Sequence, residues 1–331
     1  MILSSQLKIR EEDLLPLERD YYRDEGSNTQ EISFLKAAWQ RLLANRIAMC
    51  SLLVILLILL FSAIGPSLSP YSYEQQIYGD ENMPPSWTHP FGTDRLGRDL
   101  MVRCMIGTRI SLTVGIISAV IVLIIGSIYG SVSGLVGGKV DLIMMRIVDV
   151  VYSVPEILLI VVIKLVIDEP LTRLVTSTPF LKPLQKMGSG LIAIFIVYGC
   201  LYWVGMARIV RGQVLQLKEM EYVTAAEALG AGKSWLIRKH LIPNCIGQLI
   251  ATAMLQIPSA IFTEAFLSFL GIGVSAPMAS LGSLTSEALS GLTTAPYRMI
   301  FPAALISLII LAFNLFGDGL RDALDPKMKK R

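Results

Sequence analysis

Long stretches of this chain carry no charged side chain, and their spacing predicts how the chain is organised. Five such windows cover residues 47–73, 110–138, 187–207, 241–263 and 299–317. A helix needs about 20 apolar residues to cross the roughly 30 Å hydrocarbon layer of a membrane, so each window is long enough. A sixth apolar stretch, 147–167, contains Asp149, Glu156 and Lys164. We therefore expect six spans, at 47–68, 110–133, 147–167, 189–208, 245–270 and 299–317.

The spans are expected to be helices, because a backbone in lipid must satisfy its own hydrogen bonds and strands do so only in a closed barrel. Barrel strands alternate in polarity, whereas residues 52–61 read LLVILLILLF. Composition agrees, since 53% of the 331 residues are hydrophobic and 17% are charged, against about a quarter charged in soluble domains. The predicted fold class is an all-α integral membrane protein with six transmembrane helices. Disordered chains and small disulfide scaffolds are excluded.

Lysine and arginine predict the orientation, because cytoplasmic loops carry an excess of both. With six spans, the two termini and the even-numbered connections share one side. From Lys36 onward that side holds 16 basic residues, against nine on the other. We therefore place the N-terminal segment 1–46, the connection 209–244 and the tail 318–331 in the cytoplasm. The loop 69–109 is placed outside.

The N-terminal segment ends in an amphipathic pattern. Residues 32–46 place Ile32, Leu35, Trp39, Leu42 and Leu43 on one helical face. Such a helix suits the cytoplasmic membrane surface, where its apolar side enters the headgroup region. An ordinary cytoplasmic cap is the alternative interpretation.

The longest cytoplasmic connection, 209–244, contains a helix-forming segment at 218–229. Small residues gather in it and just after it: Ala225, Ala226, Ala228, Gly230, Ala231 and Gly232. They let another surface approach the backbone closely, while Tyr222, Leu229 and Trp235 supply apolar anchors. A short helix of this kind suits a groove on another protein, and its glycines are expected to end it. A solvated loop helix without a partner is the alternative interpretation.

The sequence GAGKS at 230–234 looks like part of a phosphate-binding loop but lacks its context. That motif needs a glycine five residues before its second glycine and follows a strand. Here the position holds Glu227, and an alanine-rich helical segment precedes it. We therefore expect no nucleotide site and no cofactor in this chain. With two histidines and no closely paired cysteines, we expect no metal site either.

The 209–244 connection resembles the coupling loop of permease subunits of binding-protein-dependent ABC importers. That family's pattern is Glu-Ala-Ala, three residues, Gly, nine residues, Ile-x-Leu-Pro, and Ala225, Ala226, Gly230 and Pro243 match in place. Thr224 stands where the first Glu is usual, His240 replaces Ile, and Ile242 replaces Leu. The resemblance implies the following ATPase-coupling residues: Glu221, Tyr222, Thr224, Ala225, Ala226, Ala228, Leu229, Gly230 and Ala231.

Further segments narrow the resemblance to the peptide-importer branch. They are HPFGTD at 89–94, LGRD at 96–99, GTRISL at 107–112, MRIVD at 145–149, LSFLG at 267–271, LAFN at 311–314 and RDALDP at 321–326. Nickel-importer permeases look similar and are an alternative. The resemblance implies a type I ABC importer permease fold, with the transmembrane domain at 110–317, in the cytoplasmic membrane of a bacterium or archaeon.

The resemblance also implies partners. These are a second homologous permease subunit, two ATPase subunits that bind ATP and magnesium, and an extracellular substrate-binding protein. Peptide would be the substrate and membrane lipid the surroundings, and no nucleic acid is expected. Closure of the ATPases would move the coupling helix and switch the spans between two packings.

Two acidic residues inside predicted spans are candidates for lining the pathway, because charge in a membrane is costly and usually functional. Glu156 follows Pro155, and Glu264 comes six residues after Pro258. The prolines would open their helices toward a cavity. For Glu156, snorkelling to an aqueous edge or pairing with a partner chain is the alternative.

Other classes of function remain to be weighed. His89 and Asp94 have the His-x4-Asp spacing of phospholipid acyltransferases, whose sites usually face the cytoplasm, whereas our topology puts His89 outside. Thr93 and Asp94 more simply predict a cap for a short helix at 95–106. A secondary transporter working alone would usually show an internal repeat, and we find none in the sequence.

Overall fold

The computed structural model describes residues 34–178, 189–274 and 278–324. Every regular element in these ranges is helical. In chain order the helices are α1 (Phe34–Ala44), α2 (Arg46–Ala63), α3 (Gly65–Leu68), α4 (Leu100–Val136), α5 (Gly138–Ser153), α6 (Glu156–Ser177), α8 (Ser189–Leu201), α9 (Trp203–Leu217), α10 (Glu221–Ala228), α11 (Lys233–Leu236), α12 (Ile242–Phe269), α13 (Leu281–Ala288) and α14 (Tyr297–Leu324). A π-helical turn covers Ile237–Leu241, and a 3₁₀ turn covers Leu289–Gly291. The predicted all-α fold class is confirmed.

Within the described residues, five helical stretches are long and apolar enough to span a membrane, and the number is six if a pair of helices bent at a break counts as one span. The five are Arg46–Ala63, Leu100–Val136, Leu191–Leu217, Lys233–Phe269 and Tyr297–Leu324, and the pair is Gly138–Ser153 with Ile157–Ser177. Several helices are longer than the spans predicted within them, because a helix ends at a cap or a break rather than where its apolar residues stop. α4 begins ten residues before 110, α6 continues past 167, and α14 continues into the predicted tail.

The predicted short helix at 95–106 is wrong as well. Residues 93–99 form a turn in which Asp94 Oδ1 accepts hydrogen bonds from the backbone N–H groups of Leu96 (2.8 Å) and Arg98 (3.0 Å). Gly97 has a φ of +69° in this turn, a conformation that favours glycine. The helix starts only at Leu100, where Asp99 Oδ1 accepts from the N–H of Val102 at 2.8 Å. Asp94 therefore shapes a turn, and Asp99 is the cap of span two.

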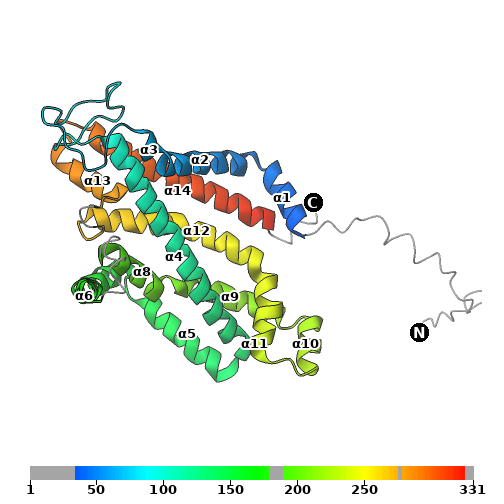
Figure 1. Ribbon diagram of the computed structural model, residues 1–331. Coiled ribbons are helices and arrows are strands. Elements are labelled where there is room, and N and C mark those ends of the chain that lie inside the picture. The colour runs from blue at the N-terminus through cyan, green and yellow to red at the C-terminus, as the bar shows by residue number, and fades with distance from the viewer. Residues whose placement is uncertain (1–33, 179–188, 275–277, 325–331) are drawn as a thin grey trace, which may run out of the picture.

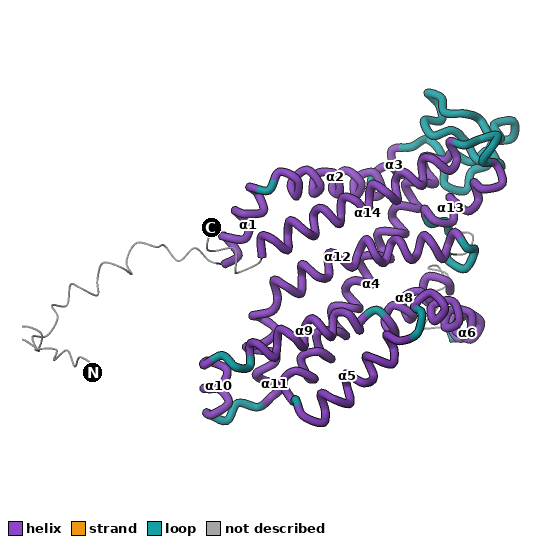
Figure 2. The backbone as a smooth tube through the Cα atoms, turned by 180° about the vertical axis from the view of Figure 1, so that it is seen from behind, coloured by secondary structure: helices purple, strands orange, loops and turns teal. Residues whose placement is uncertain are grey.

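The helices form a bundle with two distinct ends. α4 packs against α9, α12 and α2, and α14 packs against α12 and α2. Figure 1 shows α1, the C-terminal end of α14 and α10 toward one end, and the loop 69–99 with α13 at the other. The reverse view in Figure 2 shows the same separation. The grouping agrees with a topology that puts the 209–244 connection on the side of the termini, while the orientation of that side stays a prediction.

Three glycines on α4 let α9 approach its backbone. Gly126, Gly130 and Gly134 recur every fourth residue and so share one helix face. A Cβ at Gly126 would lie 2.5 Å from Cβ of Met206, and a Cβ at Gly130 would overlap the carbonyl oxygen of Ala207. Small residues at this spacing are typical of closely packed membrane helices, whose association depends on van der Waals contact.

Replacing Gly130 with valine is expected to push α4 away from α9 and destabilise the protein by about 1–3 kcal/mol, the usual cost of overpacking. The midpoint of thermal denaturation in detergent, followed as loss of the monodisperse size-exclusion peak, measures the effect. Gly212 on α9 is the matched control, because a Cβ there meets nothing within 4 Å. Gly212→Ala should be neutral or slightly stabilising. An unchanged midpoint for Gly130→Val would contradict the close packing of α4 and α9.

The amphipathic N-terminal pattern forms α1, but the predicted apolar face is divided. Leu42 is 3% exposed and lies in a small core with Ala48 of α2 and Ala323 of α14. Trp39 and Leu43 are exposed, whereas Ile32 lies outside the described residues. Tertiary contact with α14 therefore takes up one part of the face and leaves Trp39 and Leu43 for other surroundings. That α1 lies on the membrane surface stays a prediction.

Candidate coupling helix and membrane cavity

The predicted coupling segment forms α10, which is shorter than the expected 218–229. A Schellman motif ends it: the N–H of Gly230 donates to the carbonyl oxygen of Glu227 at 2.9 Å, and the N–H of Ala231 donates to that of Ala226 at 3.0 Å. Gly230 has a φ of +89°, which a residue with a Cβ rarely adopts. Gly232, by contrast, has a φ of −69°. Only the first of the two glycines is therefore required by the backbone.

The two faces of α10 have different surroundings. Val223 is 1% exposed and packs, with the partly buried Ala226 and Ala231, in a core that includes Leu236 and Leu241. The exposed residues are Glu221, Tyr222, Thr224, Ala225, Glu227, Ala228, Leu229 and Gly230. The small residues are thus divided, because Ala226 and Ala231 are half-buried against the bundle. These two attach α10 to the bundle, and Leu229, 89% exposed, projects from the open face.

Aromatic contacts connect α10 to the start of span five. The ring of His240 lies 5.8 Å from that of Tyr222 and 4.9 Å from that of Trp235, measured between centroids. His240 belongs to the π-helical turn, which the N–H of Ile242 closes by donating to the carbonyl oxygen of Ile237. Such turns are frequent at functional sites. The sequence signal for it was Pro243, which has no N–H to continue the regular pattern.

Two ion pairs join α9, the helix that leads into α10, to α5. Arg211 makes a two-pronged contact with Asp141, with N–O distances of 2.5 and 2.6 Å. Arg208 Nη2 lies 2.9 Å from Asp149 Oδ1, and its guanidinium carbon lies 4.5 Å from the centroid of the Tyr152 ring. The bidentate contact of Arg211 is the stronger and more directional of the two. The two ion pairs therefore connect α9 to α5.

A cavity of about 560 Å³ lies where α5 ends. The helix breaks at Val154 and Pro155, and the axes of the two segments differ by 92°. The helix break expected at Pro155 is confirmed, and that Glu156 lines the pathway stays a prediction. Around the cavity lie residues 151–155 and Leu159, four residues of α8 and α9 or between them (Leu201, Tyr202, Val204 and Gly205), and Gln256 and Ser259 of α12. Glu156 is the first residue of α6, and its side chain lies outside the described part of the chain.

Glu264, the other predicted pathway residue, lies in the core. Its side chain is 0% exposed and accepts hydrogen bonds from Ser111 Oγ at 3.0 Å and Ser268 Oγ at 2.7 Å. Pro258 lies inside α12 without ending it, so the expectation that this proline opens span five is wrong. In this conformation Glu264 connects α12 to α4, and its place in the pathway stays a prediction.

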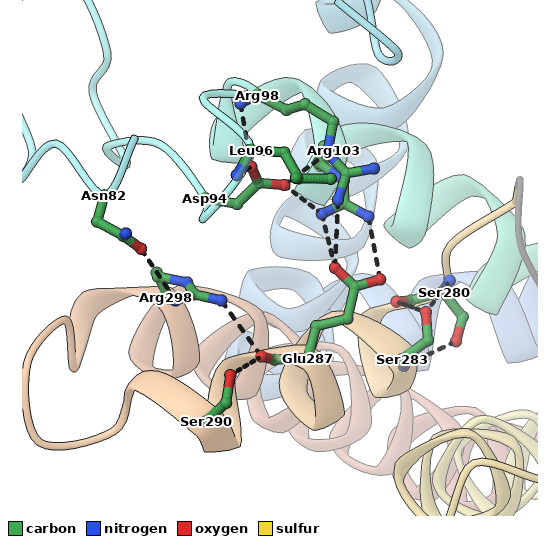
Figure 3. Close-up of polar contacts among 10 residues, drawn as sticks. All are labelled: Asn82, Asp94, Leu96, Arg98, Arg103, Ser280, Ser283, Glu287, Ser290 and Arg298. Carbon is green, nitrogen blue, oxygen red and sulfur yellow. Dashed lines mark hydrogen bonds and ion pairs between the residues drawn. The ribbon is translucent and has the colours of Figure 1, made fainter. Parts of the chain in front are cut away.

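A charged cluster that the sequence analysis missed joins the loop 69–99 to α4 and α13 (Figure 3). Arg103 is 2% exposed, and its Nη1 donates to Asp94 Oδ2 at 2.6 Å and to Glu287 Oε2 at 2.8 Å. Arg298 donates to Asn82 Oδ1 at 3.0 Å and to the backbone carbonyl of Glu287 at 3.2 Å. The signal in the sequence was the group of basic residues at 95–109, which served only to predict the orientation of the spans.

The environment of Asp94 keeps its carboxylate charged. Burial by itself would raise the pKa of Asp94. Hydrogen bonds from the backbone N–H groups of Arg98 and Leu96, together with the Arg103 guanidinium, outweigh burial and hold the pKa below its ordinary value. Arg98 Nε adds an ion pair with Asp94 Oδ2 at 2.7 Å. The carboxylate is therefore a fixed anion at the centre of the cluster.

The structure does not bring His89 and Asp94 together as a catalytic pair. His89 Nδ1 lies 2.8 Å from Oδ2 of Asp99, and the imidazole stacks on Tyr71 with 4.5 Å between centroids. The His89 side chain is only 3% exposed, while Asp94 contacts arginines. These residues support the loop, and the acyltransferase alternative loses the pair on which it depended.

Comparison with known proteins decides the family. Residues 111–330 match the family described as binding-protein-dependent transport system inner membrane component. The chain belongs to this family of transport permeases. Residues 33–85 also match the N-terminal transmembrane domain of oligopeptide transport permease C. The resemblance seen in the coupling loop is thereby confirmed, and the fold is that of a type I ABC importer permease.

Several permeases resemble this one over nearly its whole length. The oligopeptide transport system permease protein OppC of Bacillus subtilis is 44% identical over 92% of this chain and 94% of its own length. The dipeptide transport system permease protein DppC of the same strain is 44% identical over 90% and 88%. The glutathione transport system permease protein GsiD of Pectobacterium atrosepticum is 36% identical over 88% and 90%.

Proposed function

We propose that this permease is one subunit of an ATP-driven importer that takes up peptides. The observation that carries the proposal is its similarity, over about nine-tenths of its length, to permeases named for oligopeptide and dipeptide transport. In this proposal the chain supplies half of the translocation pathway, and a second homologous permease supplies the other half. An extracellular binding protein delivers the peptide. Both termini and α10 lie in the cytoplasm, in agreement with the distribution of lysine and arginine.

The exposed face of α10 is the proposed contact with an ATPase subunit. It offers apolar Leu229 and Tyr222 beside the small side chains of Ala225 and Ala228, and such a helix face suits a groove. ATP and magnesium belong to the two ATPase subunits. When these close, α10 and α9 move together, and the ion pairs to Asp141 and Asp149 carry the movement to α5. The helix break beside the cavity would then change its opening.

The proposal is tested by assembling the complete importer in liposomes. We expect ATP-dependent uptake of a labelled peptide when the second permease, both ATPases and the binding protein are present. The same liposomes with this chain alone should neither hydrolyse ATP nor accumulate peptide. Uptake of nickel ions without uptake of peptide would instead support the nickel-importer alternative. Transport by the single chain without ATP would contradict the proposal and favour a secondary transporter.

A further inference from the structure

Five uncharged polar residues form a stripe along α12, in the middle of a membrane span. We call them the α12 stripe: Gln248, Thr252, Gln256, Ser259 and Thr263. At 100° per residue they fall within an arc of about 80°, and each is partly or fully exposed. The neighbouring residues Leu249, Ala253, Ile257 and Ala260 are buried. The stripe is therefore a face of its own, distinct from the face that packs in the core.

The stripe borders the cavity beside the helix break. Gln256 and Ser259 line the cavity directly. Tyr202, also in the lining, places its hydroxyl oxygen 3.0 Å from Oγ1 of Thr263. Val154 and Pro155, which interrupt the helix, also line the cavity. Polar side chains and non-helical backbone thus meet at one place in the span.

Lipid is an unfavourable environment for the α12 stripe and for the helix break at Val154 and Pro155. Thr252 and Thr263 donate their hydroxyls to the backbone carbonyls of Gln248 and Ser259 in their own helix, so the cost of unsatisfied polar groups, several kcal/mol each in hydrocarbon, applies to the other three stripe residues. Non-helical backbone at membrane depth persists only where protein buries it or where it lines a water-filled cavity. Two independent features, the stripe and the break, therefore indicate a polar pathway. Discontinuous helices mark substrate sites in other transporters for the same reason.

Building on the proposed function, we propose that the α12 stripe binds the backbone of a peptide during its passage. Each glutamine amide offers both a donor and an acceptor, which are the two groups that every peptide unit presents. The stripe carries no charge, and the segment 241–263 around it has none, so side chains of either sign pass without repulsion or trapping. From Gln248 to Thr263 the stripe is about 22 Å long. That length matches about six or seven residues of extended peptide.

Substitutions on the stripe test the inference in the reconstituted importer. Gln256→Leu and Ser259→Ala are each expected to lower the rate of peptide uptake roughly fivefold, the effect of one lost hydrogen bond. The reduction should be the same for acidic, neutral and basic peptides of equal length. Ser307→Ala is the matched control, because Ser307 is exposed on α14 and its hydroxyl bonds only to the backbone of its own helix, at Ala303. Rates are normalised to assembled complex, measured by size-exclusion chromatography.

The outcomes separate this inference from the proposed function. If the unmodified importer takes up no peptide, the proposed function fails. If it takes up peptide and both stripe variants do so at the same rate, only the inference is overturned. If the variants no longer assemble with the second permease, the stripe is a subunit interface, which also overturns the inference.

A photoreactive peptide gives a second readout that does not depend on transport rate. A peptide carrying benzoylphenylalanine at its centre is irradiated in the assembled importer, and the adducts are mapped by mass spectrometry. We expect adducts within 248–263 and 151–155 of this chain. Adducts confined to the second permease would overturn the inference.

Discussion

Replacing Arg103 with methionine is expected to destabilise the protein by about 3–5 kcal/mol, the range for removing one partner of a buried ion pair. The guanidinium is 2% exposed and contacts both Asp94 and Glu287. Without it, the buried Asp94 carboxylate keeps its charge and loses its main cation from α4. The expected result is a lower midpoint of thermal denaturation in detergent and faster proteolysis within the loop 69–99.

Arg95→Met is the matched control for Arg103→Met. It removes the same charge from the turn before α4, but Arg95 is exposed, so its effect should stay within about 0.5 kcal/mol. The folded pKa of Asp94 lies below its ordinary value. The stabilisation from this carboxylate is therefore fully present above the unfolded pKa of about 3.9 and is lost as the pH falls through the folded pKa. The difference between Arg103→Met and the unmodified protein should hold from about pH 5 to about pH 8. Equal midpoints of thermal denaturation for Arg103→Met and the unmodified protein would show that the cluster does not stabilise the loop 69–99.

Replacing Gly230 with tryptophan is expected to abolish coupling between ATP hydrolysis and transport. Backbone strain and steric bulk both contribute. The φ of Gly230 is +89°, and the residue is exposed just after the C-terminal end of α10. A Cβ in the left-handed region costs roughly 1–2 kcal/mol, and the indole would hold a docked ATPase away. Uptake should fall by more than roughly tenfold. A strain of about 1.4 kcal/mol by itself corresponds to a factor of ten in an equilibrium constant, and the bulk of the indole adds to it. Uptake and ATP hydrolysis are measured in the same liposomes.

The neighbouring glycine provides the control for Gly230→Trp. Gly232 has a φ of −69°, and a Cβ there meets nothing within 4 Å. Gly232→Ala should therefore transport at close to the unmodified rate. Gly230→Ala should fall between the two, since it adds the backbone strain without the bulk. Normal coupled transport by Gly230→Trp would show that α10 is not the coupling helix.

Local features were predictable from the sequence because their causes are local. The apolar windows identify spans since transfer of a segment into hydrocarbon depends on the segment's own composition. The glycine after the alanine-rich segment predicted the end of α10, because a left-handed residue there is a property of the backbone alone. Pro155 predicted the break in span three for a similar reason. Helix ends were less predictable, since the cap at Asp99 and not the first residue of the apolar window decides where α4 begins.

Only the tertiary structure decided which side chains are buried and which of them contact one another. Ala226 and Ala225 are adjacent and chemically identical, yet only Ala226 packs in the core. Glu264 looked like an intramembrane charge open to a pathway, and in this conformation it is buried and accepts hydrogen bonds from serine hydroxyls on α4 and α12. Arg103 and Glu287 are 184 residues apart in sequence, so no local pattern could pair them. The sequence by itself determined the apolar helices and the end of α10, because hydrophobicity and backbone conformation act residue by residue. Only the folded chain decided the buried ion cluster and the cavity, because both depend on side chains brought together by helix packing.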